Sequence, residues 1–216
     1  MDQFTVWDIV RNLLLATRWT IVLSVIAFVG GGIVGFAIML LRVSDLRALR
    51  ALSIAYIDVL QGTPLLMQLF LCFFGISLLG FEISPLVAAS IALTAYSSAY
   101  LAEIWRGCVD AIPKGQREAA ESLGFRFIDM LRYVILPQAI RIAVAPTVGF
   151  SVQVVKGTAL ASIIGFVELT KAGTIITNAT FKPFLVYGFV AIIYFALCYP
   201  LSVWSRDFER RLRAAH

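Results

Sequence analysis

Four ionisable residues lie within or beside long apolar stretches of this 216-residue chain: Asp58, Glu103, Lys156 and Glu168. Charged side chains inside membrane helices are costly, and they often mark the path of a transported solute. Two of the four also have an ordinary structural explanation. Glu103 can pair with Arg106 one helical turn later, and the Lys156 side chain can extend to the membrane surface. The sequence leaves both explanations open.

Two short sequences interrupt the apolar stretches, Gln61-Gly62-Thr63-Pro64 and Lys156-Gly157-Thr158. A proline removes one helical hydrogen bond, so Pro64 is expected to break its helix. Broken membrane helices often line binding sites, although some breaks are simple kinks. The candidates for a solute path are therefore Asp58, Gln61, Gly62, Thr63, Pro64, Glu103, Lys156, Thr158 and Glu168.

The sequence lacks the residue clusters of a catalytic or metal centre. Its three cysteines, Cys72, Cys108 and Cys198, lie far apart without a CxxC pair, and its single histidine is His216. This pattern favours neither a disulfide framework nor a metal site. The nucleotide-binding pattern G-x-x-x-x-G-K-[ST] does not occur in the sequence, so ATP would have to bind to another chain. A membrane-embedded enzyme is therefore a weak hypothesis.

The elements that hold these residues are expected to be membrane-spanning helices. Only 14% of the residues are charged and 60% are hydrophobic, whereas a soluble domain has about 25% charged residues. The apolar runs are unbroken and reach the ~20 residues of a membrane helix, unlike the alternating ~10-residue segments of a β-barrel. The sequence predicts one all-α transmembrane domain over residues 1–216, with five spans near residues 19–41, 52–79, 84–105, 138–160 and 183–205.

The first span is expected to act as an uncleaved anchor. The sequence begins MDQF, without the basic region of a signal peptide. A short polar-faced segment is predicted at residues 2–18, ahead of the span at 19–41. Within that span, the cluster Gly30-Gly31-Gly32 and Gly35 favours close packing against another helix.

Five spans place the two ends of the chain on opposite sides of the membrane. Thirteen of the eighteen lysines and arginines fall on the side of the C-terminus. Because basic residues accumulate in cytoplasmic loops, the sequence predicts an outside N-terminus and an inside C-terminus. The same bias explains the net charge of +5 without a nucleic-acid partner.

This orientation places the charged segment 110–137 in the cytoplasm. Apolar residues recur there every three or four positions, beginning with Ala120 and Leu123, as in an amphipathic helix. Gly124 can adopt the positive φ that ends a helix, and Pro137 can occupy the first turn of the next span. We expect a helix near residues 115–123, a turn at 124–126 and a second short helix. The pattern alone permits a loop on the membrane surface or a docking element.

The amino-acid sequence of this segment resembles the conserved cytoplasmic loop of ABC-importer permeases. In that loop, Glu-Ala-Ala is followed by three residues, a glycine, nine residues, an isoleucine, any residue and Leu-Pro. This chain matches at Glu118-Ala119-Ala120, Gly124 and Leu136-Pro137, and it has Val134 in place of the isoleucine. The stretches YIDVLQGTPLLMQ, YLAEIWRG and KGTALASIIGFVELT resemble the polar-amino-acid branch of these permeases, which includes histidine and glutamine permeases. Two positions depart from the pattern of that branch. Gln61 stands where arginine is usual, and Arg126 stands where a serine or threonine would cap the second short helix.

The resemblance implies a type I ABC-importer permease of a bacterial plasma (inner) membrane, with a polar amino acid as substrate. It implies a second permease subunit (the same or a homologous chain), a pair of ATPase subunits and a substrate-binding protein in the periplasm or outside. ATP and Mg would bind to the ATPase, with no cofactor in this chain. The residues implied in contact with the ATPase or in transmitting its motion are Glu118, Ala119, Ala120, Glu121, Gly124, Leu136 and Pro137.

The alternative is a small secondary carrier or channel that works alone. Internal repeats are common in such carriers, and no second repeat is visible in this sequence. Copurification of an ATPase would separate the two hypotheses.

Overall fold

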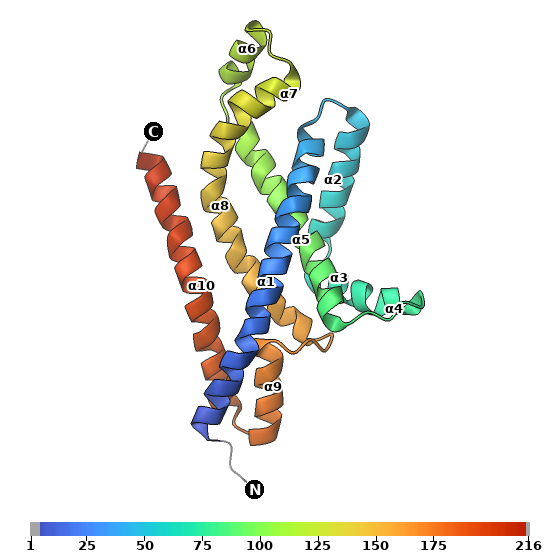
Figure 1. Cartoon of the computed structure of the whole chain (residues 1–216), viewed down its shortest axis with the longest axis vertical. Coiled ribbons are helices and arrows are strands. Elements are labelled where there is room, and N and C mark those ends of the chain that lie inside the picture. Colours follow the sequence, from blue (N-terminus) through green and yellow to red (C-terminus); the bar gives the residue numbers. More distant parts are fainter. Residues whose placement is uncertain (1–4, 215–216) are drawn as a thin grey trace.

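The described residues fold into helices and connecting loops (Figure 1). The computed structural model describes residues 5–214. The longer helices are α1 (Val6–Val43), α2 (Arg47–Gly62), α5 (Pro85–Asp110), α8 (Leu136–Gly157) and α10 (Pro183–Ala214). The shorter ones are α3 (Leu65–Phe70), α4 (Ile76–Leu78), α6 (Lys114–Ser122), α7 (Phe127–Met130) and α9 (Leu169–Thr180). Two π-helical turns (Leu71–Gly75 and Leu131–Ile135) and one 3₁₀ turn (Thr158–Ser162) continue these helices. The predicted all-α class is confirmed over this part of the chain.

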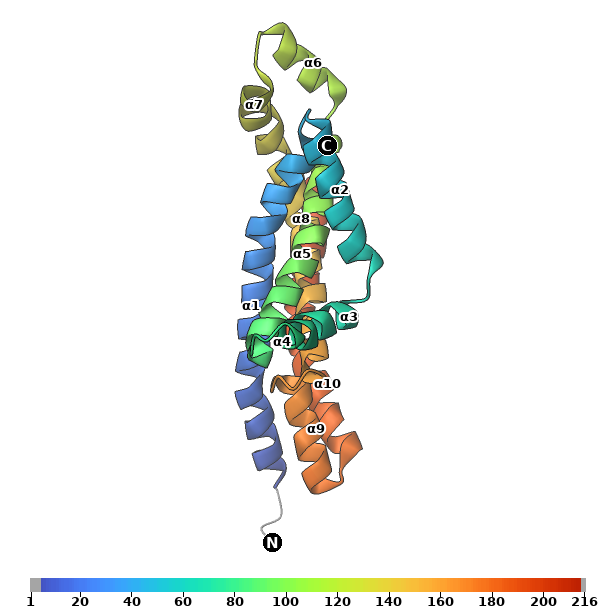
Figure 2. The same ribbon diagram turned by 90° about the vertical axis from the view of Figure 1, so that its right-hand side faces the viewer.

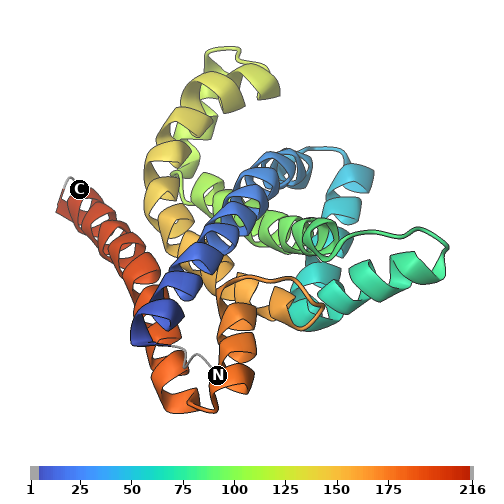
Figure 3. The same cartoon turned by 60° about the horizontal axis from the view of Figure 1, so that its bottom comes forward.

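Four helical runs within residues 5–214 are long and apolar enough to cross a membrane: α1, α5, the run Phe127–Ser162 and α10. A fifth span exists if α2 and the run Leu65–Leu78 count as one, but these two are bent by 102°. The stretch expected to form a span at 52–79 is therefore broken, and its second half projects sideways from the bundle (Figures 1 and 3).

The break occurs at Thr63 and Pro64, where the sequence predicts it, and both residues have extended backbone angles. Because Pro64 has no N–H, the Leu60 carbonyl loses its normal helical donor. Gln68 replaces that donor: its Nε2 donates to the Leu60 carbonyl at 2.7 Å and to Thr63 Oγ1 at 3.0 Å. The carbonyl freed by the proline is thus already occupied by a protein group.

Helix α1 is longer than the sequence suggests, because the segment predicted separately at 2–18 is continuous with the span from Val6 onward. A capping box fixes its start: Thr5 Oγ1 accepts from the Asp8 N–H at 3.2 Å, and the Asp8 carboxylate accepts from the Thr5 N–H at 3.0 Å. Residues 1–4, which open the predicted segment, and His216 lie outside the described residues.

Helices α1 and α5 pack closely against each other (Figure 2). A Cβ on Gly31 would lie 2.5 Å from Ser97 Cβ, and a Cβ on Gly35 would lie 2.8 Å from the Ser98 carbonyl oxygen. Neither position has room for a side chain. The close packing predicted from the glycine cluster is therefore confirmed.

The ends of the molecule carry different short helices: α6 and α7 lie at one end and α9 at the other (Figure 2). The sequence predicts no helix between 163 and 182, yet α9 occupies much of this stretch. It packs against the first half of α1 and against α10 (Figure 3), in a core around Leu13, Leu169 and Val186.

Candidate coupling site and solute path

The charged segment folds as predicted as far as Gly124. Ala120 of α6 is 3% exposed and is buried among apolar side chains that include Ile112 and Met130. Gly124 has a φ of +78°, which glycine adopts without strain. The Phe125 N–H then donates to the Ala120 carbonyl at 3.1 Å and closes the end of the helix. The predicted helix stop is confirmed.

The side of α6 opposite Ala120 is exposed. Glu118, Ala119 and Glu121 lie on this exposed surface. Leu123, expected on the inner face, is 78% exposed because the helix ends at its position and the chain turns at the following glycine. Ile128 nearby is 73% exposed. Apolar groups exposed beside charges are typical of a protein-binding surface.

The second short helix is not separate, contrary to the prediction. α7 continues through the π turn Leu131–Ile135 into α8 as one helical run. Pro137 explains the π turn physically, because its ring would clash with the carbonyl of Tyr133 in a regular α-helix. Arg126 makes no side-chain hydrogen bond at the start of α7, so its N-cap position lacks the bond a serine or threonine would supply. Leu136 packs against the apolar cluster around Ala120.

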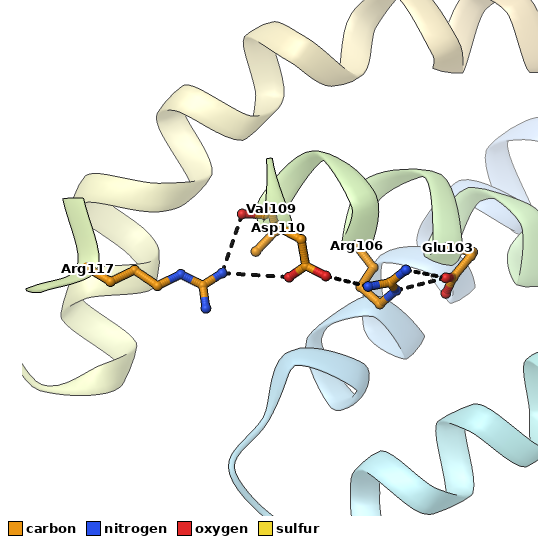
Figure 4. Close-up of polar contacts among 5 residues, drawn as sticks. All are labelled: Glu103, Arg106, Val109, Asp110 and Arg117. Atoms are coloured by element: carbon orange, nitrogen blue, oxygen red, sulfur yellow. Dashed lines mark hydrogen bonds and ion pairs between the residues drawn. The ribbon is translucent and has the colours of Figure 1, made fainter. Parts of the chain in front are cut away.

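A row of charges of alternating sign connects α5 to α6 (Figure 4). Arg106 Nε donates to Glu103 Oε1 at 2.8 Å, and Arg106 also pairs with Asp110. Arg117 of α6 reaches the other oxygen of Asp110 at 3.8 Å and the Val109 carbonyl at 3.4 Å. The structural explanation of Glu103, an ion pair with Arg106, is thereby confirmed. A role of Glu103 in the solute path stays a prediction.

The residues around the break in the second span lie at the surface or face α5. Asp58, Gly62 and Pro64 are exposed. Gln61 Nε2 donates to the Ala99 carbonyl of α5 at 3.3 Å, and Thr63 Oγ1 donates to Val59 of its own helix at 2.8 Å. Gln61 is therefore directed toward the neighbouring span.

The two interrupted stretches meet in space. A Cβ on Gly157 would lie 3.3 Å from Leu65 Cδ2, so the end of α8 lies against the start of α3. Lys156 next to it is exposed, whereas Thr158 is fully buried and donates to the Val155 carbonyl at 2.7 Å. Within the two interrupted stretches, Lys156 is the charged residue, and it is exposed.

Glu168 lies apart from that surface and is fully buried. It caps α9: its carboxylate accepts from the Thr170 and Lys171 N–H groups, each at 2.9 Å. It also accepts from Tyr194 Oη of α10 at 2.8 Å and from Thr20 Oγ1 of α1 at 3.4 Å. Its observed contacts join three helices, and a role in the solute path stays a prediction.

Another polar surface, on α8 and α10, was missed from the sequence. A groove of about 380 Å³ is lined by Gly149, Val152, Gln153, Ser202, Ser205 and Arg206. Gln153 is exposed and lies about one helical turn before Lys156. A glutamine within a mostly apolar span was the signal available in the sequence.

Comparisons with known proteins agree with the resemblance seen in the loop. Residues 29–214 match the family described as the binding-protein-dependent transport system inner membrane component. The probable glutamine ABC transporter permease protein GlnM of Bacillus subtilis (strain 168) is 33% identical over 197 residues, which cover 91% of each chain. The glutamine transport system permease protein GlnP of Escherichia coli (strain K12) is 31% identical over 214 residues, which cover 98% of each chain.

Solved structures extend this similarity to the fold. A chain in the crystal structure of an amino acid ABC transporter with histidines superposes with a TM-score of 0.90 at 34% identity, over 98% of this chain and 99% of that one. A chain of the MetNI methionine ABC transporter, in an inward facing conformation, has the same fold with a TM-score of 0.71 at 21% identity, over the full length of both chains. The chain therefore belongs to the family of binding-protein-dependent transport system inner membrane components, whose members among its relatives are permease proteins of amino-acid ABC transporters.

Proposed function

We propose that this multi-pass membrane protein is the permease subunit of an ATP-driven importer of a polar amino acid in a bacterial plasma membrane. Its N-terminus would lie outside and its C-terminus inside. The observation that carries the proposal is α6, a short helix at one end of the molecule with an exposed, charged face and exposed apolar neighbours. The close relatives are amino-acid permeases, which supports the substrate class.

Helix α6 is the element that meets a separate ATPase. Glu118, Ala119 and Glu121 face the partner, and the small Ala119 allows the two backbones to approach. Gly124 sets the angle between α6 and α7. Because α7 and α8 are one continuous helix through Leu136 and Pro137, movement of the loop carries the span with it. The ATPase supplies the sites for ATP and Mg, and the permease itself needs no cofactor.

The solute path lies on the face where polar side chains meet the surface of the spans. Gln153 and Lys156 are exposed on α8, and the break at Pro64 adjoins the end of the same helix. Exposed polar groups are unfavourable against lipid. A second permease subunit, of the same or a homologous chain, covers this face. A substrate-binding protein delivers the amino acid to its outer end.

The test is assembly and transport in vesicles, with the ATPase and the substrate-binding protein of the same transporter. We expect the wild-type chain to copurify with the ATPase and to import its amino acid only when ATP is present inside. Glu118→Lys reverses a charge on the exposed face, and we expect it to lose ATPase binding while the chain keeps its melting temperature. Glu82→Lys, an exposed residue between α4 and α5, is the matched control. Uptake by the purified chain alone, without an ATPase, would instead establish a secondary carrier or channel.

A further inference from the structure

Two consecutive residues of α6 contact two different spans. Gln116 Oε1 accepts from Gln138 Nε2, in the first turn of α8, at 3.3 Å. Arg117 instead reaches the end of α5, where Nη2 lies 3.4 Å from the Val109 carbonyl oxygen and 3.8 Å from Asp110 Oδ1 (Figure 4). α6 is therefore attached by polar side chains to the ends of both spans.

The contact between α6 and α5 brings a positive charge to the C-terminal end of α5. Asp110 is the last residue of α5, and a negative charge at a helix C-terminus is unfavourable because of the helix dipole. Arg106, within α5, neutralises one oxygen of Asp110 and is shared with Glu103. Arg117 approaches the other oxygen and also binds a carbonyl of the last turn. A cation that fits the end of α5 is thus supplied by α6.

The exposure of this contact indicates what it does. The side chain of Arg117 is 39% exposed and that of Asp110 is 51% exposed. Exposed ion pairs contribute little to the stability of a fold. The burial of Ala120 already holds α6 on the molecule through apolar contacts. The contact between Arg117 and α5 is therefore not what holds α6 on the molecule, and we expect the fold to survive its removal.

We propose that Arg117 is a positioning residue that transmits the movement of α6 to α5 through Asp110. The loop then moves two spans together: α8 through the continuous helix, and α5 through the row of charges that ends at Glu103. This rests on the proposed function, in which an ATPase moves α6. It adds a second route of transmission. When this route is lost, ATP is still hydrolysed, but less amino acid is imported for each ATP molecule.

The test uses the complete complex, with the ATPase and the binding protein, in phospholipid vesicles. Arg117→Met keeps the length of the side chain and removes the guanidinium group. We expect the ATPase to copurify as with the wild type, while the number of ATP molecules hydrolysed per amino acid imported rises about two- to fivefold, the size expected from the loss of one exposed ion pair. Arg117→Lys keeps the charge and should recover part of the ratio. Arg210→Met removes the same charge from an exposed position on α10 and should change nothing.

A double-mutant cycle identifies the partner. Asp110→Asn removes the interaction with Arg117 and also the ion pair with Arg106, so its effect should be at least as large as that of Arg117→Met. The double variant should be no worse than Asp110→Asn alone, because the interaction between Arg117 and Asp110 is then already absent. A wild-type ratio in Arg117→Met, with the ATPase still bound, would overturn the inference. So would loss of the ATPase from Arg117→Met alone, because Arg117 would then be a docking residue. Failure of the wild-type chain to bind the ATPase would overturn the proposed function instead.

Discussion

At the scale of single residues, the strongest prediction concerns Glu168. Its carboxylate satisfies two backbone N–H groups at the start of α9 and accepts from Tyr194 and Thr20. Glu168→Ala removes the cap and leaves buried donors without partners, so we expect a loss of about 2–4 kcal/mol in stability. The melting temperature in detergent should fall, and Glu82→Ala, in an exposed loop position, should leave it unchanged. Equal melting temperatures would show that Glu168 has no structural role.

The sequence predicts residue contacts when both partners lie on one helix or turn. The pair of Glu103 and Arg106 and the turn at Gly124 follow from spacing alone, and the structure has both. The partners of Glu168 cannot be predicted in this way. Thr20 lies 148 residues away along the chain, and only the packing of α1, α9 and α10 brings the two together. Arg117 and Asp110 are only seven residues apart, but they belong to different helices, so the spacing within one helix does not predict their contact.

At the scale of helices, the contact between α1 and α5 can be tested with two adjacent glycines. A Cβ on Gly31 would lie 2.5 Å from Ser97 Cβ, whereas a Cβ on Gly32 has its nearest neighbour at 3.8 Å, on Trp105. We expect Gly31→Ala to destabilise the protein by about 1–3 kcal/mol, because the two helices must move apart. Gly32→Ala should be neutral. The measurement is the melting temperature of each variant in the same detergent, and equal values for the two would contradict the close packing.

The helices that the sequence predicts well are those with long apolar runs. The break at Pro64 is also predictable, because the missing N–H is a property of one residue. α9 is missed because it has only 12 residues and lies outside the long apolar runs. The continuity of α7 with α8 is missed for a different reason. A proline usually marks a boundary, but a π turn just before Pro137 allows the helix to continue past it.

At the scale of the whole molecule, the pair of helices α8 and α10 has two unlike sides. One side carries the groove of about 380 Å³ with Gln153 and Arg206. The other forms a groove of about 660 Å³ with α1, lined mainly by apolar side chains such as Val29 and Leu197. Lipid tails cannot satisfy the polar groups of the first side, but they suit the second. The subunit contact is therefore expected at the side of Gln153.

This arrangement predicts where single cysteines react in a chain whose three native cysteines are replaced by alanine. We expect Gln153→Cys to form a crosslink to the partner permease in membranes and to react with a water-soluble maleimide once the path opens. Val29 is 53% exposed and lines the apolar groove. We therefore expect Val29→Cys to form no crosslink and to react only with a lipid-soluble reagent. The opposite pattern would place the partner on the side of α1. Because both positions lie on spans of one chain, any difference between them reports the surroundings of the two faces.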